Sequence, residues 1–262
     1  MTANTTRLLQ ITDLHIRSTP MSRFMATELD TDATLQAVLD EIHANEPAGS
    51  IVVATGDLVQ EPHESAYQRL KQRLSGSLNR YFMLPGNHDD PVLARKTLNR
   101  DNSWCVGQHA LDDWLMLFLD TCQQPERTEG MLSKAELSRL ERTLAVSGQR
   151  HVMLFLHHPP VRIGSAWMDA IGLANAEELF AITDRYPQVK GMVFGHIHQQ
   201  FEASRKNVRM IGSPSTCIQF RPGTDSFEAD MLPPAYRWFD LRQDGSFETG
   251  VRYLHAEMRQ AV

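Results

Sequence analysis

Short apolar runs of strand length recur along the first three quarters of the chain, and most are rich in β-branched or aromatic residues. They span Arg7–Ile11, Ser50–Ala54, Tyr81–Leu84, Trp114–Leu119, Val152–Leu156 and Val189–Phe194. Apolar runs of this length, bounded by turn residues, are typical of buried strands. The pattern therefore predicts six strands in this part of the protein.

Helical spacing of apolar residues separates several of these runs. It covers Thr31–His43, Ser133–Leu144 and Asn175–Tyr186. The second segment opens with Ser133 and, three residues later, Glu136, which is the pattern of a capping box. Asn175 is placed to cap the third helix. Strands that alternate with helices indicate βα units and a largely parallel sheet.

The last quarter of the chain has a different pattern. Phe201–Ile211 and Tyr236–Tyr253 read as short strands, with a turn at Gln243–Ser246, and we expect antiparallel strands beside the main sheet. The Pro159–Pro160 and Pro233–Pro234 segments read as loops rather than linkers. With no repeat and no low-complexity tract, residues 1–262 are expected to form a single domain.

Composition restricts the class of protein. Hydrophobic residues make up 42% of the 262 residues, which is enough for a large core. The net charge of −6 argues against non-specific binding to nucleic acid. The chain lacks a recognisable signal peptide and any apolar run long enough to span a membrane, so we expect a cytoplasmic protein. Its three cysteines are widely spaced and are expected to be buried free thiols.

The chain has 11 histidines, and several of them follow the ends of predicted strands together with aspartate and asparagine. The polar groups that follow five strands are Asp13 and His15, Asp57, Asn87 with His88 and Asp89, His157 with His158, and His196 with His198. Because the carboxyl ends of parallel strands share one edge of a sheet, these side chains are expected to converge on one crevice.

Carboxylate, amide and imidazole groups without thiolate suit Mn, Fe, Zn or Mg. Two such ions about 3.5–4 Å apart can clamp the attacking and leaving oxygens of a phosphoryl transfer, and a carboxylate must bridge them. Asp57 is the candidate for the bridge. Glycine before Asp57, Asn87 and His196 would allow a sharp turn at the strand end.

Taken singly, these residues have ordinary explanations. Asp13 and Asp57 could cap helices, His15 and His198 could be solvated loop residues, and Gly86–Asn87 could be a plain turn. These explanations do not account for five strand ends that carry ligand-type side chains.

The same residues form motifs that resemble those of the calcineurin-like metallophosphoesterase superfamily. The motifs are Asp13-x-His15, Gly56-Asp57, Gly86-Asn87-His88-Asp89, His157 and Gly195-His196-x-His198, in the order of that family. The resemblance implies an α/β fold, specifically a four-layer α/β/β/α sandwich with mixed sheets. It also implies two divalent metal ions, Fe and/or Mn or else Zn, with a bridging hydroxide as nucleophile.

The resemblance further implies a role for each site residue. One metal would be held by Asp13, His15, Asp57 and His198, and the other by Asp57, Asn87, His157 and His196. The adjacent His158 would be a neighbour of the metal site rather than a ligand. His88 would contact the phosphate and protonate the leaving oxygen, and Asp89 would orient its ring. The substrate would be contacted by His15, Asp57, Asn87, His88 and His198.

Longer segments resemble the bacterial class III 3′,5′-cyclic AMP phosphodiesterases. They are Thr12–His15, Ala54–Leu58, Leu84–His88, His157–Pro159, Ser165–Asp169 with Asn175, Gly195–Gln199 and Pro214–Phe220. This resemblance implies hydrolysis of cyclic AMP to 5′-AMP. Trp167 and Phe220 could form an aromatic wall for the purine, with Asn175 or Gln219 reaching a ring nitrogen, or both aromatic rings could belong to the core.

Three other functions stay open. The same centre could cleave glycerophosphodiesters, 2′,3′-cyclic nucleotides or other small diesters. The fold could serve as a non-catalytic metal-binding scaffold, although a scaffold has no need of the full ligand set. A nuclease is disfavoured by the acidic charge balance. The expected partner is therefore a small cyclic nucleotide, with no nucleic acid and no membrane, and the sequence leaves the oligomeric state open.

Overall fold

The computed structural model describes residues 5–19, 29–98, 107–122 and 127–254 of the chain. The helices are α1 (Thr31–Asn45), α2 (Glu64–Ser77), α3 (Pro91–Leu98), α4 (Lys134–Val146), α5 (Ala166–Asp169) and α6 (Ala176–Thr183). The strands are β1 (Thr5–Ile11), β2 (Ile51–Thr55), β3 (Tyr81–Leu84), β4 (Gly107–Leu111), β5 (Trp114–Phe118), β6 (His151–Leu156), β7 (Val189–Phe194), β8 (Phe201–Arg205), β9 (Val208–Gly212), β10 (Gln219–Phe220), β11 (Ala229–Asp230), β12 (Ala235–Arg242) and β13 (Phe247–Tyr253).

These strands form two large mixed sheets and one small hairpin. The first sheet has the order β13-β12-β1-β2-β3, and the second has the order β4-β5-β6-β7-β9-β8. In the first, β1, β2 and β3 are parallel and β12 and β13 are antiparallel additions. In the second, β5, β6, β7 and β9 are parallel, with β4 and β8 antiparallel at the edges. The hairpin pairs β10 with β11.

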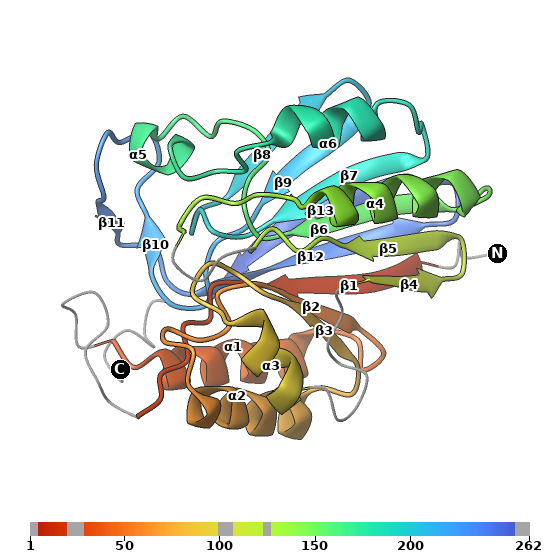
Figure 1. The fold of residues 1–262 in the computed structure, drawn as a ribbon. Helices are drawn as coiled ribbons and strands as arrows, with labels where there is room; N and C mark the ends of the chain where they lie inside the picture. The colour runs from red at the N-terminus through yellow and green to blue at the C-terminus, as the bar shows by residue number, and fades with distance from the viewer. Residues whose placement is uncertain (1–4, 20–28, 99–106, 123–126, 255–262) are drawn as a thin grey trace.

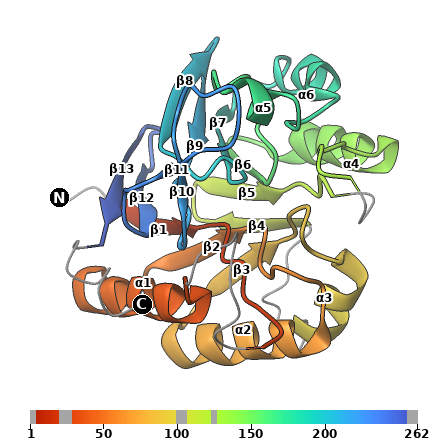
Figure 2. The ribbon, with the colours of Figure 1, turned by 90° about the vertical axis from the view of Figure 1, so that its left-hand side faces the viewer.

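Helices cover the outer face of each large sheet. In Figure 1, α1, α2 and α3 lie below the first sheet, and Figure 2 shows α4 and α6 to the right of the second sheet. The cores confirm four layers, because alternate residues of one strand enter different cores. In β2, Val52 packs in the core beneath α1 and α2, whereas Val53 packs between the sheets. In β6, Leu154 packs beneath α4, and Phe155 packs between the sheets.

This layering confirms the expected four-layer sandwich and corrects the simpler picture of one parallel sheet. Strands buried on both faces read as continuous apolar runs, so the hydrophobic pattern does not reveal which sheet a strand joins. The tail strands also divide, since β12 and β13 extend the first sheet while β8 and β9 extend the second. The expected turn at residues 243–246 joins β12 to β13.

The predicted helices form with differences at their ends. The Ser133 hydroxyl accepts the backbone N–H of Glu136 at 3.0 Å, which confirms one half of the capping box. In the other half of a capping box, the Glu136 carboxylate would accept the backbone N–H of Ser133. Here it accepts the Asp120 N–H at 3.0 Å instead. Asn175 occupies the first position before α6, but its side chain does not cap the helix, so that expectation was wrong.

A polar bridge joins the two sheets next to their apolar interface. The Gln10 side chain, on β1, donates to the Thr55 hydroxyl at 2.8 Å and to the Phe194 carbonyl at 3.0 Å. Its carbonyl oxygen accepts the Ser213 hydroxyl. Arg237, on β12, is fully buried and donates to the Ser213 hydroxyl and to the carboxylate of Glu202. These contacts link the ends of strands from both sheets.

Among the helices of the described ranges, none has the length and apolar character needed to cross a membrane.

Candidate active site

The predicted ligands follow the carboxyl ends of strands from both sheets. Asp13 and His15 follow β1, Asp57 follows β2, and Asn87 follows β3, all in the first sheet. His157 follows β6, and His196 and His198 follow β7, in the second sheet. The hairpin of β10 and β11 and the short helix α5 lie at this end of the molecule, which faces the viewer in Figure 2. The crevice therefore lies between two sheets, not at the edge of one.

Most of these ligands adopt a backbone conformation that is unusual for residues with side chains. The φ angles are 53° at Asp13, 47° at His15, 47° at Asp57, 70° at His196 and 45° at His198. Such left-handed conformations cost on the order of 1–3 kcal/mol each and concentrate at functional sites. The sharp turn at each strand end is thus made largely by the ligand residues themselves.

The glycines that precede the ligands mostly serve close packing. Gly56 has a φ of 96°, as the sequence predicted for a sharp turn. Gly86 and Gly195 do not share this conformation. A Cβ atom on Gly86 would lie 2.1 Å from an oxygen of Asp57, and one on Gly195 would lie 2.0 Å from the Thr12 hydroxyl. These two positions require glycine because neighbouring groups of the site press against the backbone.

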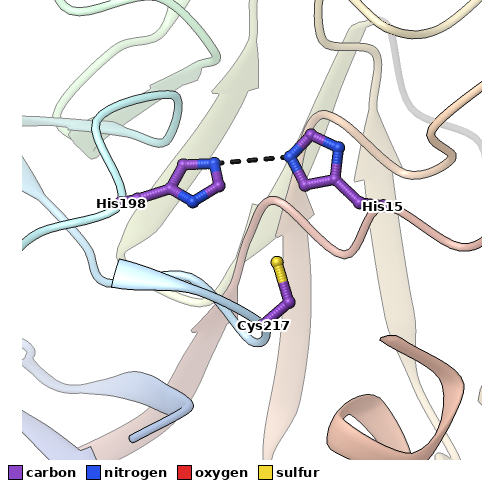
Figure 3. Close-up of side chains that lie close together, drawn as sticks. All are labelled: His15, His198 and Cys217. Atoms are coloured by element: carbon purple, nitrogen blue, oxygen red, sulfur yellow. Dashed lines mark hydrogen bonds between the residues drawn. The ribbon is translucent and has the colours of Figure 1, made fainter. Parts of the chain in front are cut away.

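One group of donor atoms gathers around His15 and His198. Their Nε2 atoms lie 3.3 Å apart, and Figure 3 shows the two rings facing each other. The His15 Nε2 atom is 3.7 Å from the Asp57 carboxylate, and the His198 Nε2 atom is 3.3 Å from that of Asp13. All four side chains are buried.

A second group gathers around His157. Its Nε2 atom lies 3.3 Å from Oδ1 of Asp57, 3.2 Å from Oδ1 of Asn87 and 3.2 Å from Nδ1 of His196. The Asp57 carboxylate therefore presents one oxygen to each group. This is the geometry required of a bridging ligand.

The donor set fits divalent metal ions. Two atoms that bind one ion at about 2.0–2.2 Å lie at most ~4.4 Å apart, and the separations given above satisfy that limit. The ring nitrogens of His15 and His198, and those of His157 and His196, face each other at hydrogen-bond distance. These buried nitrogens, together with the neighbouring carboxylates, form clusters that could hold a metal ion.

Backbone carbonyls orient two of the rings. The Nδ1–H group of His157 donates to the Thr55 carbonyl at 2.8 Å, and that of His198 donates to the Ile218 carbonyl at 2.7 Å. With Nδ1 engaged in this way, Nε2 is the atom of each ring that faces the site, and it can offer a lone pair to a metal ion. Metal-binding histidines characteristically have such a partner on the far side of the ring.

The pKa values follow from burial and from the close approach of the two charge types. Burial alone would raise the pKa of Asp57, but the facing ring of His157 lowers it well below its usual range. Burial alone would lower the pKa of His157, but the Asp57 carboxylate raises it to about 9. At His15 and His196 burial dominates and lowers each pKa to about 3, so these rings are neutral near pH 7.

Comparison with known proteins agrees with this geometry. The family model of the calcineurin-like phosphoesterases matches residues 6–200 of the chain. The chain belongs to the calcineurin-like phosphoesterase family. The matched segment contains every predicted ligand, from Asp13 to His198.

Several relatives of this family are similar over nearly the whole chain. The 3′,5′-cyclic adenosine monophosphate phosphodiesterase CpdA of Pseudomonas aeruginosa is 36% identical over 93% of this chain and 88% of its own length. The CpdA protein of Escherichia coli is 34% identical over 95% of this chain and 90% of its own. A 3′,5′-cyclic-nucleotide phosphodiesterase of Nostoc is 33% identical over 93% of this chain and 91% of its own.

A solved structure supports the fold. A dimetal phosphatase from Danio rerio matches with a TM-score of 0.68, covering 93% of this chain and 98% of that protein. The sequence identity is 13%, so this likeness concerns the architecture.

Within this family site, His157 and His158 are adjacent but differ in their surroundings. The Nε2–H group of His158 donates to the Thr128 carbonyl at 3.1 Å, and Nδ1 accepts the Thr121 hydroxyl at 2.8 Å. Both ring nitrogens are thus engaged by the protein. The geometry favours His157 as the ligand, and Thr121 is a contact that the sequence motifs did not identify.

The expected pairing of Asp89 with the ring of His88 does not occur among the hydrogen bonds of the described residues. The Nδ1–H group of His88 donates to the Gln60 carbonyl at 3.0 Å. Asp89 instead accepts the backbone N–H groups of Leu58 and Gly86 at 3.0 and 2.8 Å, together with the hydroxyl of Tyr67. Burial raises the pKa of Asp89 to about 7. Its contacts fix the loop that carries Asn87 and His88.

The side chains considered for contact with a purine are engaged elsewhere. Asn175 accepts the Leu132 N–H and donates to the Leu132 carbonyl, each at 3.0 Å. Gln219 is bound to the backbone of Ser215 at both ends of its amide. Phe220 is 5% exposed and belongs to the core beneath the second sheet's helices. The core interpretation therefore holds for Phe220, and neither amide is free to reach a ring nitrogen.

The thiol of Cys217 lies beside the site, which the sequence did not predict. Its sulfur lies within 4.8 Å of nitrogens of His15 and His198 and points between the two rings in Figure 3. Burial raises the pKa of this thiol to about 12, and it donates to the Asp13 carbonyl. Cys217 is thus a buried free thiol as expected, whereas Cys122 is half-buried and Cys105 lies outside the described residues.

Proposed function

We propose that this protein hydrolyses 3′,5′-cyclic AMP to 5′-AMP at a centre of two divalent metal ions. The observation that carries the proposal is that the other six predicted ligands gather in two groups, and that Asp57 presents one carboxylate oxygen to each group. Whole-length similarity to several proteins named as 3′,5′-cyclic nucleotide phosphodiesterases supports the choice of substrate.

The two groups of donors assign the ligands. Asp13, His15, Asp57 and His198 would hold one ion, and Asp57, Asn87, His157 and His196 would hold the other. Bound divalent ions lower the pKa of water and neutralise the phosphate. Mixed oxygen and imidazole ligands suit Fe and/or Mn, with Zn as the alternative.

His88 is placed to act on the leaving group. Its backbone N–H donates to Asp57 at 3.0 Å, and its ring lies 4.9 Å from that of His15. The Nδ1–H bond to Gln60 leaves Nε2 for the phosphate. Protonation of the leaving 3′ oxygen would come from Nε2, while the Gln60 carbonyl fixes the orientation of the ring through Nδ1.

The remaining residues bind and position the substrate. His15, Asp57, Asn87, His88 and His198 would contact the phosphate of the substrate. Asp89 acts as a positioning residue, because its bonds to Leu58, Gly86 and Tyr67 fix the loop that carries Asn87 and His88. Phosphoryl transfer depends mainly on such positioning and on charge stabilisation.

The test is a comparison of substrates with the purified, metal-reconstituted protein. Specificity constants are measured under one metal condition for cyclic AMP, cyclic GMP, 2′,3′-cyclic AMP and a glycerophosphodiester. We expect cyclic AMP to give the highest kcat/KM. A much higher value for the 2′,3′ isomer or the glycerophosphodiester would overturn the substrate and keep the two-metal phosphodiesterase. Absence of hydrolysis in a protein that binds two metals would favour a non-catalytic scaffold.

A further inference from the structure

Three contacts from one short segment hold the ring of His198. The Ile218 carbonyl accepts its Nδ1–H group at 2.7 Å. The ring of Phe220 stacks on it with centroids 3.9 Å apart and an angle of 4° between the planes. The Phe220 backbone N–H donates to the His198 carbonyl at 2.9 Å. The segment therefore fixes the edge, the face and the backbone of this histidine.

The ring of Phe220 is itself supported by two aromatic side chains. Trp167, on α5, lies with its ring 5.3 Å away at 56°, and Phe227, before β11, lies 5.2 Å away at 85°. The Trp167 indole N–H donates to the Thr224 hydroxyl at 3.3 Å, which ties α5 to the hairpin loop. These contacts leave Phe220 buried and unable to slide away from His198.

The segment is also anchored at its base. The Gln219 amide accepts the Ser215 N–H at 2.9 Å and donates to the carbonyls of Ser215 and Pro233 at 2.8 and 3.2 Å. The Ser215 hydroxyl donates to the Asp13 carbonyl at 2.8 Å. One loop thus supports His198 and contacts the backbone of Asp13, the two residues whose side chains face each other at 3.3 Å.

We propose that Phe220 is a positioning residue for His198, acting through the face of its ring. A hydrogen bond to Nδ1 fixes one point of an imidazole but leaves the ring able to tilt about that bond. The stacked ring removes this freedom and keeps Nε2 directed at Asp13 and His15. The inference rests on the proposed function in one respect, namely that His198 binds a metal.

This assignment gives a role to the segments Ser165–Asp169 and Pro214–Phe220, which contribute no predicted metal ligand. His198 covers one face of the Phe220 ring, and Trp167 and Phe227 also pack against this ring. Partners behind a metal-binding histidine typically change metal affinity about 10–100-fold when removed. The effect should fall on one ion, because His157 and His196 have no part in this stack among the described contacts.

The experiment measures Mn²⁺ binding to the metal-stripped full chain by calorimetric titration. Phe220→Leu and Phe220→Met both remove the flat ring, and the methionine variant keeps more of the volume if the leucine variant folds poorly. Phe220→Tyr keeps the ring. Phe201→Leu is the matched control, because Phe201 packs against the same core but contacts Phe194 rather than His198. Thermal unfolding of each variant reports whether it is folded.

For the folded Phe220→Leu or Phe220→Met protein we expect one of two Mn²⁺ dissociation constants to rise about 10–100-fold, with the other unchanged. Phe220→Tyr and Phe201→Leu should bind both ions as the native chain does. In a His198→Ala background, Phe220→Met should cause no further loss. Unchanged binding in Phe220→Met, or an equal further loss without His198, would overturn the inference. Native two-metal binding without cyclic AMP hydrolysis would instead overturn the proposed function and leave this inference intact.

Discussion

The two sheets of the sandwich contribute different chemistry to the site. The first sheet supplies both carboxylates, the amide and one histidine, from the ends of β1, β2 and β3. The second supplies three histidines, from the ends of β6 and β7. Each proposed metal position combines oxygens from the first sheet with nitrogens from the second. Neither sheet can complete a metal position alone, so the site depends on how the two sheets pack.

The sheets also differ in how their ligands are held. The first sheet orients two ligands of the second sheet. The Thr55 carbonyl accepts a hydrogen bond from the Nδ1–H group of His157. The Asp13 carboxylate accepts the backbone N–H of His196 at 3.1 Å. His198 is instead held by Ile218 and Phe220, from the segment that leads into the hairpin. The second sheet's ligands thus have two independent supports, and mutations can separate them.

The strongest test of the comparison is Asp57→Asn. This carboxylate faces His15 of its own sheet at 3.7 Å and His157 of the other sheet at 3.3 Å. We expect the variant to lose both ions and its kcat/KM to fall roughly a thousandfold or more, which corresponds to an activation free energy that is higher by several kcal/mol. His196→Ala should lose one ion.

Elemental analysis of the purified variants gives the stoichiometry, with Asp40→Asn on the exposed side of α1 as the control. Two bound metals in Asp57→Asn would contradict the assignment of this residue as the bridge.

His88→Ala tests a first-sheet residue that is not assigned as a ligand. We expect both metals to remain and turnover of cyclic AMP to fall about 10²–10⁴-fold, the usual contribution of a positioned acid. A nitrophenyl diester, whose leaving group needs little protonation, should lose much less. Steady-state kinetics on both substrates measure this difference, and an equal loss on both would exclude the role of His88 as the leaving-group acid.

Much of the fold could be predicted because local patterns determine it. The runs at Tyr81–Leu84 and Val189–Phe194 match β3 and β7 residue for residue, since an apolar run between turns leaves little choice. The division of the strands between two sheets came only from the family resemblance. It depends on which face of each strand meets which layer, and strands such as β2 and β6 are apolar on both faces.

The predicted ligands were brought together by the fold, but their supporting contacts were less predictable. Motif spacing marks a ligand because it lies next to a strand end. The partner of His88 proved to be the Gln60 carbonyl rather than Asp89, and a backbone carbonyl carries no side-chain signal in a sequence. The prediction that Asn175 caps a helix was also wrong, because its side-chain amide forms hydrogen bonds with the backbone of Leu132, 43 residues away in the sequence. Tertiary hydrogen bonds of this kind override local preference.

Gln10→Leu tests how much the polar contacts between the two sheets beside the site contribute to the free energy of unfolding. The substitution keeps an apolar fit but leaves the Phe194 carbonyl and the hydroxyls of Thr55 and Ser213 with a partner missing. A buried polar group without its partner costs about 1–3 kcal/mol, and we expect the free energy of unfolding to fall by about that amount.

Urea unfolding measures the change, with Gln68→Leu on the exposed face of α2 as a control expected to stay within about 0.5 kcal/mol. Equal stability of the Gln10 variant and the native chain would show that apolar packing alone holds the sheets together.

The smallest effect is expected at Asp120, a carboxylate that follows β5 in the second sheet. Burial raises its pKa to about 6, and Glu136 adds to this. The folded state therefore binds a proton that the unfolded state releases near pH 3.8, so the protein loses stability as the pH rises from about 4 to 6. Asp120→Asn should remove this loss. It should raise the free energy of unfolding at pH 7 by about 1–2 kcal/mol, less than the full shift implies because the half-buried group is screened.

Urea unfolding at pH 4 and pH 7 measures the gain, which should disappear at the lower pH, and Asp113→Asn in the exposed turn after β4 is the control. Metal stoichiometry should stay at the native value, because this carboxylate accepts the Cys122 N–H at 2.8 Å and belongs to neither donor group. Loss of a metal would show that the second sheet supplies a carboxylate to the site, and the division of donors between the sheets would then be wrong.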